Sequence, residues 1–218
     1  MNFLRNHWYD MGAPFIAIIL AWLGAAHAAL TNYEVLMWLS LAALLCHQLE
    51  EYRVVGTFPG MLNRVMFKSE TPDRYPLNTN SALAVNVVVG WSAYFMAALL
   101  GEHAVWLGLA TIMVSLGNIV AHTFVFNIKG KTFYNAGLAT SWLLFAPCVF
   151  CFFRIVTGQG LASPTDYLIG IALGVVFNVF GIFKLIRWMA DKHSPYTFAR
   201  RNLLPADRNA ANKIEVDA

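Results

Sequence analysis

The sequence predicts an all-α protein, a polytopic bundle of transmembrane helices, and three observations carry this prediction. Of 218 residues, 58% are hydrophobic and only 12% are charged, whereas an average soluble domain has roughly 25% charged residues. The hydrophobic residues gather in runs that approach the ~20 residues needed to cross about 30 Å of hydrocarbon. The basic residues concentrate in alternate connections between these runs. A chain with these properties lies mostly inside a bilayer.

Six membrane-spanning helices are expected, at residues 13–30, 35–52, 81–100, 103–127, 134–156 and 167–189. The first run has no small-residue cleavage site before the next one, so we interpret it as a retained helix and not a signal peptide. We expect one transmembrane domain over residues 1–192 and a polar cytoplasmic tail over 193–218. Residues 206–218 of this tail are expected to be mobile.

The distribution of basic residues predicts the orientation of the bundle. If the N-terminus is cytoplasmic, 14 of the 15 lysines and arginines fall on cytoplasmic segments and only Arg154 lies outside. Cytoplasmic loops of membrane proteins carry this excess of positive charge. We therefore expect both termini in the cytoplasm and a multi-pass location in the inner (plasma) membrane.

A polar pentad, His47-Gln48-Leu49-Glu50-Glu51, lies at the inner end of the second expected span. Only 12 residues, 35–46, precede it in that span, and roughly eight more are needed to cross the hydrocarbon. The pentad is thereby drawn into the membrane, where ionisable side chains cost several kcal/mol unless they are paired or coordinated. Such a cluster indicates a functional site.

The spacing within the pentad favours a metal ligand pair. His47 and Glu51 are four residues apart and lie one above the other on a helix, as do the paired ligands of helical metallopeptidase motifs. His122, near the inner end of the fourth span, would complete a set of two histidines and one carboxylate. This set suits catalytic zinc or non-haem iron, so one or two divalent ions are the expected cofactor. Glu50 is the candidate general base, although the two glutamates can exchange roles.

Four further polar residues are expected at the same depth, and they come from three other helices: Asn86, Asn118, Tyr134 and Asn135. They are candidates for orienting the metal ligands or for binding a substrate carbonyl. Asn178 is expected to form an interhelical hydrogen bond. The remaining histidines lie in polar ends or near the outer face, and the three cysteines form no disulfide framework.

A purely structural interpretation of each polar residue is also open. Glu50 and Arg53 can form a salt bridge at the helix end, and Glu51 can reach the cytoplasmic interface. A single histidine on a membrane helix is more often an interhelical hydrogen-bond partner than a metal ligand. What favours a site is the meeting of several such residues at one depth.

The pentad, together with Asn86, His122 and the Tyr134-Asn135-Ala136-Gly137 segment, resembles the HXXEE family of prokaryotic membrane proteins. The resemblance covers roughly residues 38–153. The family is named for this motif and has no established activity. The resemblance implies a shared site at these positions and does not name a reaction.

The function we favour is a metal-dependent membrane enzyme that acts on a lipophilic or lipid-borne substrate at the cytoplasmic leaflet. Hydrolysis through metal-activated water fits zinc, and oxidation fits iron. The alternatives are a metal-free isomerase that uses the paired carboxylates, a cation or proton transporter, and an accessory subunit. The expected partners are membrane lipids and a hydrophobic small molecule, with a homo-oligomer possible and no nucleic acid.

Overall fold

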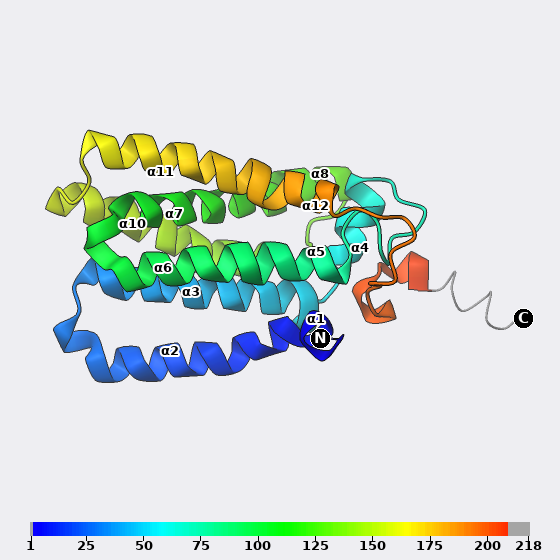
Figure 1. Ribbon diagram of the computed structural model, residues 1–218, viewed down its shortest axis with the longest axis horizontal. Helices are drawn as coiled ribbons and strands as arrows, with labels where there is room; N and C mark the ends of the chain where they lie inside the picture. Colours follow the sequence, from blue (N-terminus) through cyan, green and yellow to red (C-terminus); the bar gives the residue numbers. More distant parts are fainter. Residues whose placement is uncertain (1, 209–218) are drawn as a thin grey trace, which may run out of the picture.

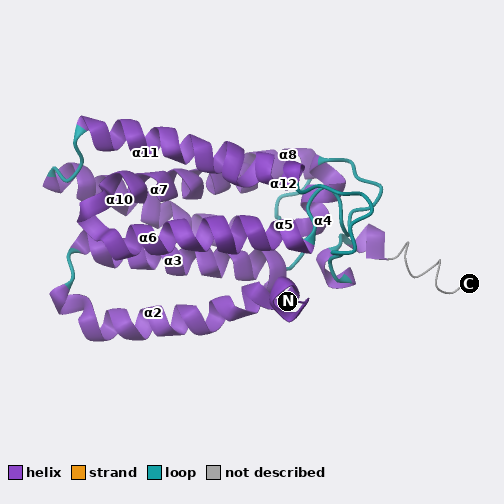
Figure 2. Ribbon diagram, viewed as in Figure 1, coloured by secondary structure: helices purple, strands orange, loops and turns teal. Residues whose placement is uncertain are grey.

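The computed structural model describes residues 2–208, which form helices and connecting loops with no strand among them. Among the described residues, six α-helices have seven or more residues, and they run along the long axis of the molecule with alternating direction (Figure 1): α2 (Gly12–Ala26), α3 (Asn32–Leu49), α6 (Ser92–Leu100), α7 (Val105–Val120), α10 (Ala146–Gln159) and α11 (Pro164–Val176). The longest loops gather at the end of the bundle where the described N-terminus lies (Figure 2). The all-α prediction is confirmed.

Shorter pieces extend or join these helices. Four are short 3₁₀ turns: η1 (Trp8–Met11), η2 (His27–Ala29), η6 (Gly101–Ala104) and η10 (Arg200–Asn202). Six are α-helical: α1 (Asn2–His7), α4 (Phe58–Gly60), α5 (Thr79–Leu83), α8 (Phe126–Gly130), α9 (Leu138–Thr140) and α12 (Leu185–Trp188). Six are π-helical: η3 (Glu50–Val54), η4 (Met61–Met66), η5 (Ala84–Trp91), η7 (Ala121–Val125), η8 (Ser141–Phe145) and η9 (Phe177–Lys184).

Four helical stretches are long and apolar enough to cross a membrane: Phe3–Ala29, Thr79–Gly130, Leu138–Gln159 and Pro164–Trp188. The second of them has 52 residues and contains two antiparallel helices, because the chain reverses at Gly101, whose φ of 53° is left-handed. Helix α3 is not among these stretches, and it lies inside the bundle, where 11 of its 18 residues are buried. The chain is therefore a multi-pass helical membrane protein.

Side-chain caps fix where three helices begin. Thr31 and Glu34 form a reciprocal capping box at the start of α3, as do Asn78 and Ser81 at α5, and Ser163 and Asp166 at α11. Such caps satisfy backbone N–H groups that have no partner within the helix. A fixed start of α3 also fixes the position of His47, which lies 15 residues further along and therefore about 22 Å down the helix.

The C-terminal segment 193–208 packs against the loop end of the bundle. Phe198 N–H donates to the Asp73 carbonyl at 2.7 Å. The Asn202 side-chain amide donates to the carbonyls of Tyr52 and Gly56, at 3.0 and 2.8 Å. This segment thereby covers the end of α3 that carries the pentad. The rest of the expected mobile tail, 209–218, lies outside the described residues.

Candidate metal centre

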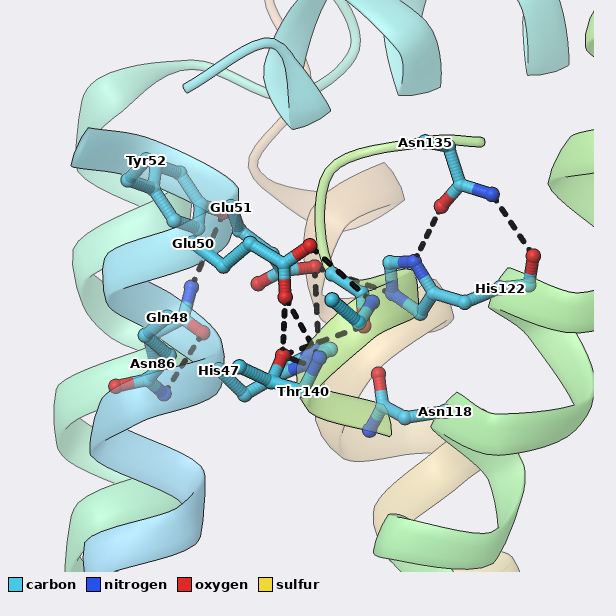
Figure 3. A network of polar contacts seen from close by, with 12 residues as sticks. His47, Gln48, Glu50, Glu51, Tyr52, Asn86, Asn118, His122, Asn135 and Thr140 are labelled. Carbon is cyan, nitrogen blue, oxygen red and sulfur yellow. Dashed lines mark hydrogen bonds and ion pairs between the residues drawn. The ribbon is translucent and has the colours of Figure 1, made fainter. Parts of the chain in front are cut away.

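His47, Glu51 and His122 meet in one buried cluster, although the chain separates His122 from the pentad by more than 70 residues (Figure 3). His47 lies in the last turn of α3, Glu51 on the π-helical turn η3 that follows, and His122 on η7. The two imidazole rings are 4.9 Å apart between centroids and perpendicular to each other. The sequence analysis predicted these three ligands, and the structure brings them together.

The spacing of the three side chains suits a shared ion. Glu51 Oε1 lies 3.5 Å from His47 Nε2 and 3.4 Å from His122 Nε2, and one ligand atom from each residue lies within 4.8 Å of the others. Two ligands that bind one tetrahedral metal at about 2.0–2.1 Å are ~3.3 Å apart. A direct N–H···O hydrogen bond is normally shorter, at about 2.7–3.2 Å. The trio can therefore hold a metal ion with only small adjustments.

The hydrogen bonds of Asn135 define which nitrogen of His122 carries the proton. The Asn135 Nδ2 group donates to the His122 carbonyl and to Asn127 Oδ1, both at 2.8 Å. This leaves Asn135 Oδ1 as the acceptor for His122 Nδ1, at 2.6 Å. His122 Nδ1 is thus the donor, and Nε2, which points at Glu51 Oε1 at 3.4 Å, is the nitrogen available to a metal ion.

A second chain of hydrogen bonds defines the same tautomer for His47. The Thr140 hydroxyl donates to Glu50 Oε2 at 2.5 Å, so its oxygen is left to accept from His47 Nδ1 at 2.9 Å. Metal-bound histidines in proteins generally donate their other ring N–H to such a partner, which fixes the ring and makes the ligating nitrogen more basic. Both histidines are arranged in this way.

The consequence is that three electron-rich atoms face one point. Among the described residues, His47 Nε2 and His122 Nε2 are buried and have no hydrogen-bond partner. Each Nε2 faces the same carboxylate oxygen, and a positive charge between the three atoms, either a metal ion or a proton on an imidazole, makes this arrangement attractive. The donor set of two imidazoles and one carboxylate is the kind that binds zinc or ferrous iron.

Gly137 holds both imidazole rings from the other side. A Cβ at this position would lie 2.4 Å from His122 Cε1 and 2.8 Å from His47 Cε1. The residue also has φ of 107°, a left-handed conformation that disfavours any side chain. The loop before α9 therefore approaches the two rings as closely as a backbone can, and only glycine fits there.

Glu50 points away from the trio and binds the start of α9. Its carboxylate accepts hydrogen bonds from the Tyr134 hydroxyl at 2.6 Å, from the Ala139 and Thr140 N–H groups at 3.3 and 2.8 Å, and from the Thr140 hydroxyl. It does not pair with Arg53, which instead binds Asp10 at 3.0 Å. A carboxylate at a helix N-terminus is well placed electrostatically. Glu50 and Tyr134 thus connect η3 to the loop that positions His47 and His122.

The two remaining predicted asparagines lie beside the trio but do not bond to it. Asn86 on η5 accepts from Gln48 Nε2 at 3.1 Å and donates to the Ala82 carbonyl at 2.9 Å. Asn118 on α7 donates to the Val114 carbonyl at 3.0 Å, one turn back along its own helix. Both line an internal cavity of about 130 Å³ that His47 and Glu51 also border.

Three contributors to the site were not predicted: Thr140, Gly137 as a packing residue, and Asn127. Thr140 is a small polar residue inside an apolar run, which is a weak signal on its own. Gly137 follows Tyr134-Asn135 in the motif, and a glycine there indicates a turn. Neither pattern alone shows that the turn closes over two histidines from other helices.

The fold and the buried trio define a class: a multi-pass helical membrane protein with a possible metal site at one end of its bundle. A family model described as "Protein of unknown function with HXXEE motif" matches residues 38–152. Since this match spans more than half of the chain, the protein belongs to the HXXEE family. No curated protein and no solved structure matches the chain.

Proposed function

We propose that this protein is a metal-dependent membrane enzyme that acts on a lipophilic substrate at the cytoplasmic leaflet. The observation that carries the proposal is the pair of buried, unpartnered Nε2 atoms that face Glu51 Oε1 at 3.4 and 3.5 Å. A zinc or iron ion bound by His47, Glu51 and His122 would satisfy all three atoms. Bound there, it would supply a nucleophilic water at neutral pH or a centre for oxidation.

The proposal includes six membrane spans with both termini in the cytoplasm of the cell and a location in the inner (plasma) membrane. The alternating directions of the helices support six spans (Figure 1). The excess of basic residues in alternate connections supports the orientation. With this topology the trio lies in the cytoplasmic half of the bilayer, because His47 is about 22 Å from the outer end of α3.

An enzymatic role is supported by the cavity beside the trio. His47 and Glu51 border this cavity of about 130 Å³, which leaves room next to the ligand atoms. Structural zinc sites have four protein ligands and are closed, whereas catalytic sites keep a position for water or substrate. Three protein ligands next to a cavity match the catalytic arrangement.

Two roles are proposed for Glu50: a general base or a positioning residue. As a general base, it would have to release at least one of its four hydrogen bonds before it could take a proton. As a positioning residue, it acts through Thr140 on His47 and keeps its present partners. The hydrogen bonds favour the positioning role.

The metal-free isomerase finds less support in the geometry. That mechanism needs two carboxylates close enough to share a proton. Glu50 is bonded to the start of α9, while Glu51 faces the two histidines. The two side chains therefore lie in different hydrogen-bonding environments.

The proposal is tested by metal content and by lipid composition. Purified wild-type protein should contain about one zinc or iron ion per chain by mass spectrometry, and His122→Ala should contain less than a tenth of that. His103→Ala, a histidine outside the cluster, is the matched control and should retain the ion. The amounts of some lipid species should differ between cells that produce the wild type and cells that produce His122→Ala. If wild-type protein still contains no metal after incubation with zinc and with iron, the proposal is refuted.

A further inference from the structure

The residues that line the cavity beside the trio are buried on one side and partly exposed on the other. Towards α3 and the loop end, its lining residues are buried, among them Leu44, Tyr52 and Leu77. On the opposite side, the lining residues of η5 and η9 are partly exposed, and Phe183 of η9 has 48% of its surface exposed. The cavity is therefore least enclosed on the side of η5 and η9, whose contact includes Val89 packed against Gly181.

The route from the loop end is closed by the C-terminal segment. Asn202 bonds to the backbone of Tyr52 and Gly56. The backbone of 202–204 packs on Gly60 so tightly that a Cβ there would lie 2.7 Å from Leu204 N. Since Tyr52 itself lines the cavity, this segment lies directly over the cavity's inner end.

In the proposed six-span topology this side of the cavity lies at hydrocarbon depth. Val89, which lines it, is ten residues from Thr79, the first residue of its helix, and therefore about 15 Å along the helix axis. That distance is about half of the hydrocarbon thickness. A molecule that enters between η5 and η9 thus comes from the lipid and not from the cytoplasm.

Two asparagines present unused acceptors inside this cavity. The Asn178 amide donates to the carbonyls of Met113 and Gly174, at 3.3 and 2.9 Å, and its Oδ1 packs against Gly117, where a Cβ would lie 2.4 Å away. Asn118 donates to its own helix. Among the described residues, neither Oδ1 has a hydrogen-bond donor, although both side chains line the cavity. A ligand with an O–H or N–H group would satisfy them.

We propose that the ligand of this cavity is a long-chain amphiphile with a hydroxyl or amide N–H at its polar end, which enters from the bilayer between η5 and η9. The cavity of about 130 Å³ is equivalent to roughly four water molecules. It takes the polar end and the adjoining carbons, while the rest of the chain passes Val89 and Phe183 into the lipid. The identification of this ligand as a substrate rests on the proposed function.

The experiment uses full-length protein in lipid nanodiscs and a photoreactive diazirine analogue of hexadecanol. Peptides from α7 and η9 should be labelled, and excess hexadecanol should compete at least fivefold better than its methyl ether, which lacks the donor. Val89→Trp should lower the labelling at least tenfold. Val88→Trp is the matched control, because Val88 is its neighbour but is 65% exposed on the outside, and it should label as the wild type does. Asn178→Leu should abolish the preference for the alcohol.

Equal labelling of Val89→Trp and Val88→Trp would overturn the side entrance, and equal competition by the methyl ether would overturn the donor requirement. Metal content and thermal unfolding of each variant show whether it is folded. Should wild type bind no metal but keep the expected labelling pattern, the proposed enzyme fails while the ligand site stands. Should it bind metal but label identically in both valine variants, the ligand route alone fails.

Discussion

Substitution of Gly137 by alanine should strongly weaken metal binding, and the distances around Gly137 indicate how far the histidine rings must move. The new Cβ would lie 2.4 Å from His122 Cε1, and 2.8 Å from both His122 Nδ1 and His47 Cε1. Carbon atoms in contact are normally about 3.5–4.0 Å apart, so the His122 ring must shift by roughly 1 Å. Metal–ligand distances tolerate only about ±0.2 Å. We expect the affinity for zinc to fall at least 100-fold.

Gly158→Ala is the matched control for this variant. A Cβ at Gly158 meets nothing within 4 Å, and alanine is favoured over glycine inside a helix such as α10. Affinity is measured by competition with a chromophoric chelator, and thermal unfolding without metal reports the fold. If folded Gly137→Ala binds zinc within threefold of the wild type, the packing argument for the site is wrong.

Three further predictions follow from the hydrogen bonds and the topology. Thr140→Val removes the link between Glu50 and His47 and should weaken metal affinity by about 10–100-fold; Thr140→Ser should restore it, and wild-type affinity in the valine variant would reject the link. Glu51→Gln should lose the metal, whereas Glu50→Gln should weaken metal affinity no more than Thr140→Val does; equal metal loss in both glutamate variants would contradict this division of roles. Reporter fusions after the three expected outer positions, Thr31, Glu102 and Gly158, should report an external location. Cytoplasmic signals at two of the three would refute the topology.

Much of the fold follows from the chain's composition along its length. Apolar runs of about 20 residues are helical in a bilayer, because a helix satisfies its backbone hydrogen bonds within one segment. The site follows from depth and not from spacing alone. His47 and His122 lie at the same end of two packed helices, with their ring centroids 4.9 Å apart.

Helix periodicity predicted that Glu51, and not Glu50, lies on the face of His47, and the cluster has this arrangement. The i,i+4 spacing of His47 and Glu51 places them on one face because an α-helix turns about 100° per residue. The structure changes to a π-helical turn at Glu50, and a π turn has its hydrogen bonds at i→i+5. Glu50 bonds to Thr140, whereas Glu51, the next residue, faces His122. The partner of Glu50 is Thr140, 90 residues away, and no local pattern identifies a contact at that separation.

The chain's helices also deviate from α geometry at the level of the site, which sequence patterns do not predict. Glu51, Asn86 and His122 each lie on a π-helical segment. Such segments occur frequently at functional sites, where an extra residue in the turn redirects side chains. A membrane span is apolar on all of its faces, so one extra residue in a turn does not change its hydrophobic pattern.

X-ray absorption at the edge of the bound metal tests the central claim most directly. We predict a first shell of nitrogen and oxygen only, at about 2.0–2.2 Å, with the outer scattering of two imidazoles. Glu51→Gln should lose this signal, and His103→Ala should keep it. A sulfur ligand at about 2.3 Å, which would place the ion at a cysteine, or a spectrum with no imidazole scattering would contradict the account.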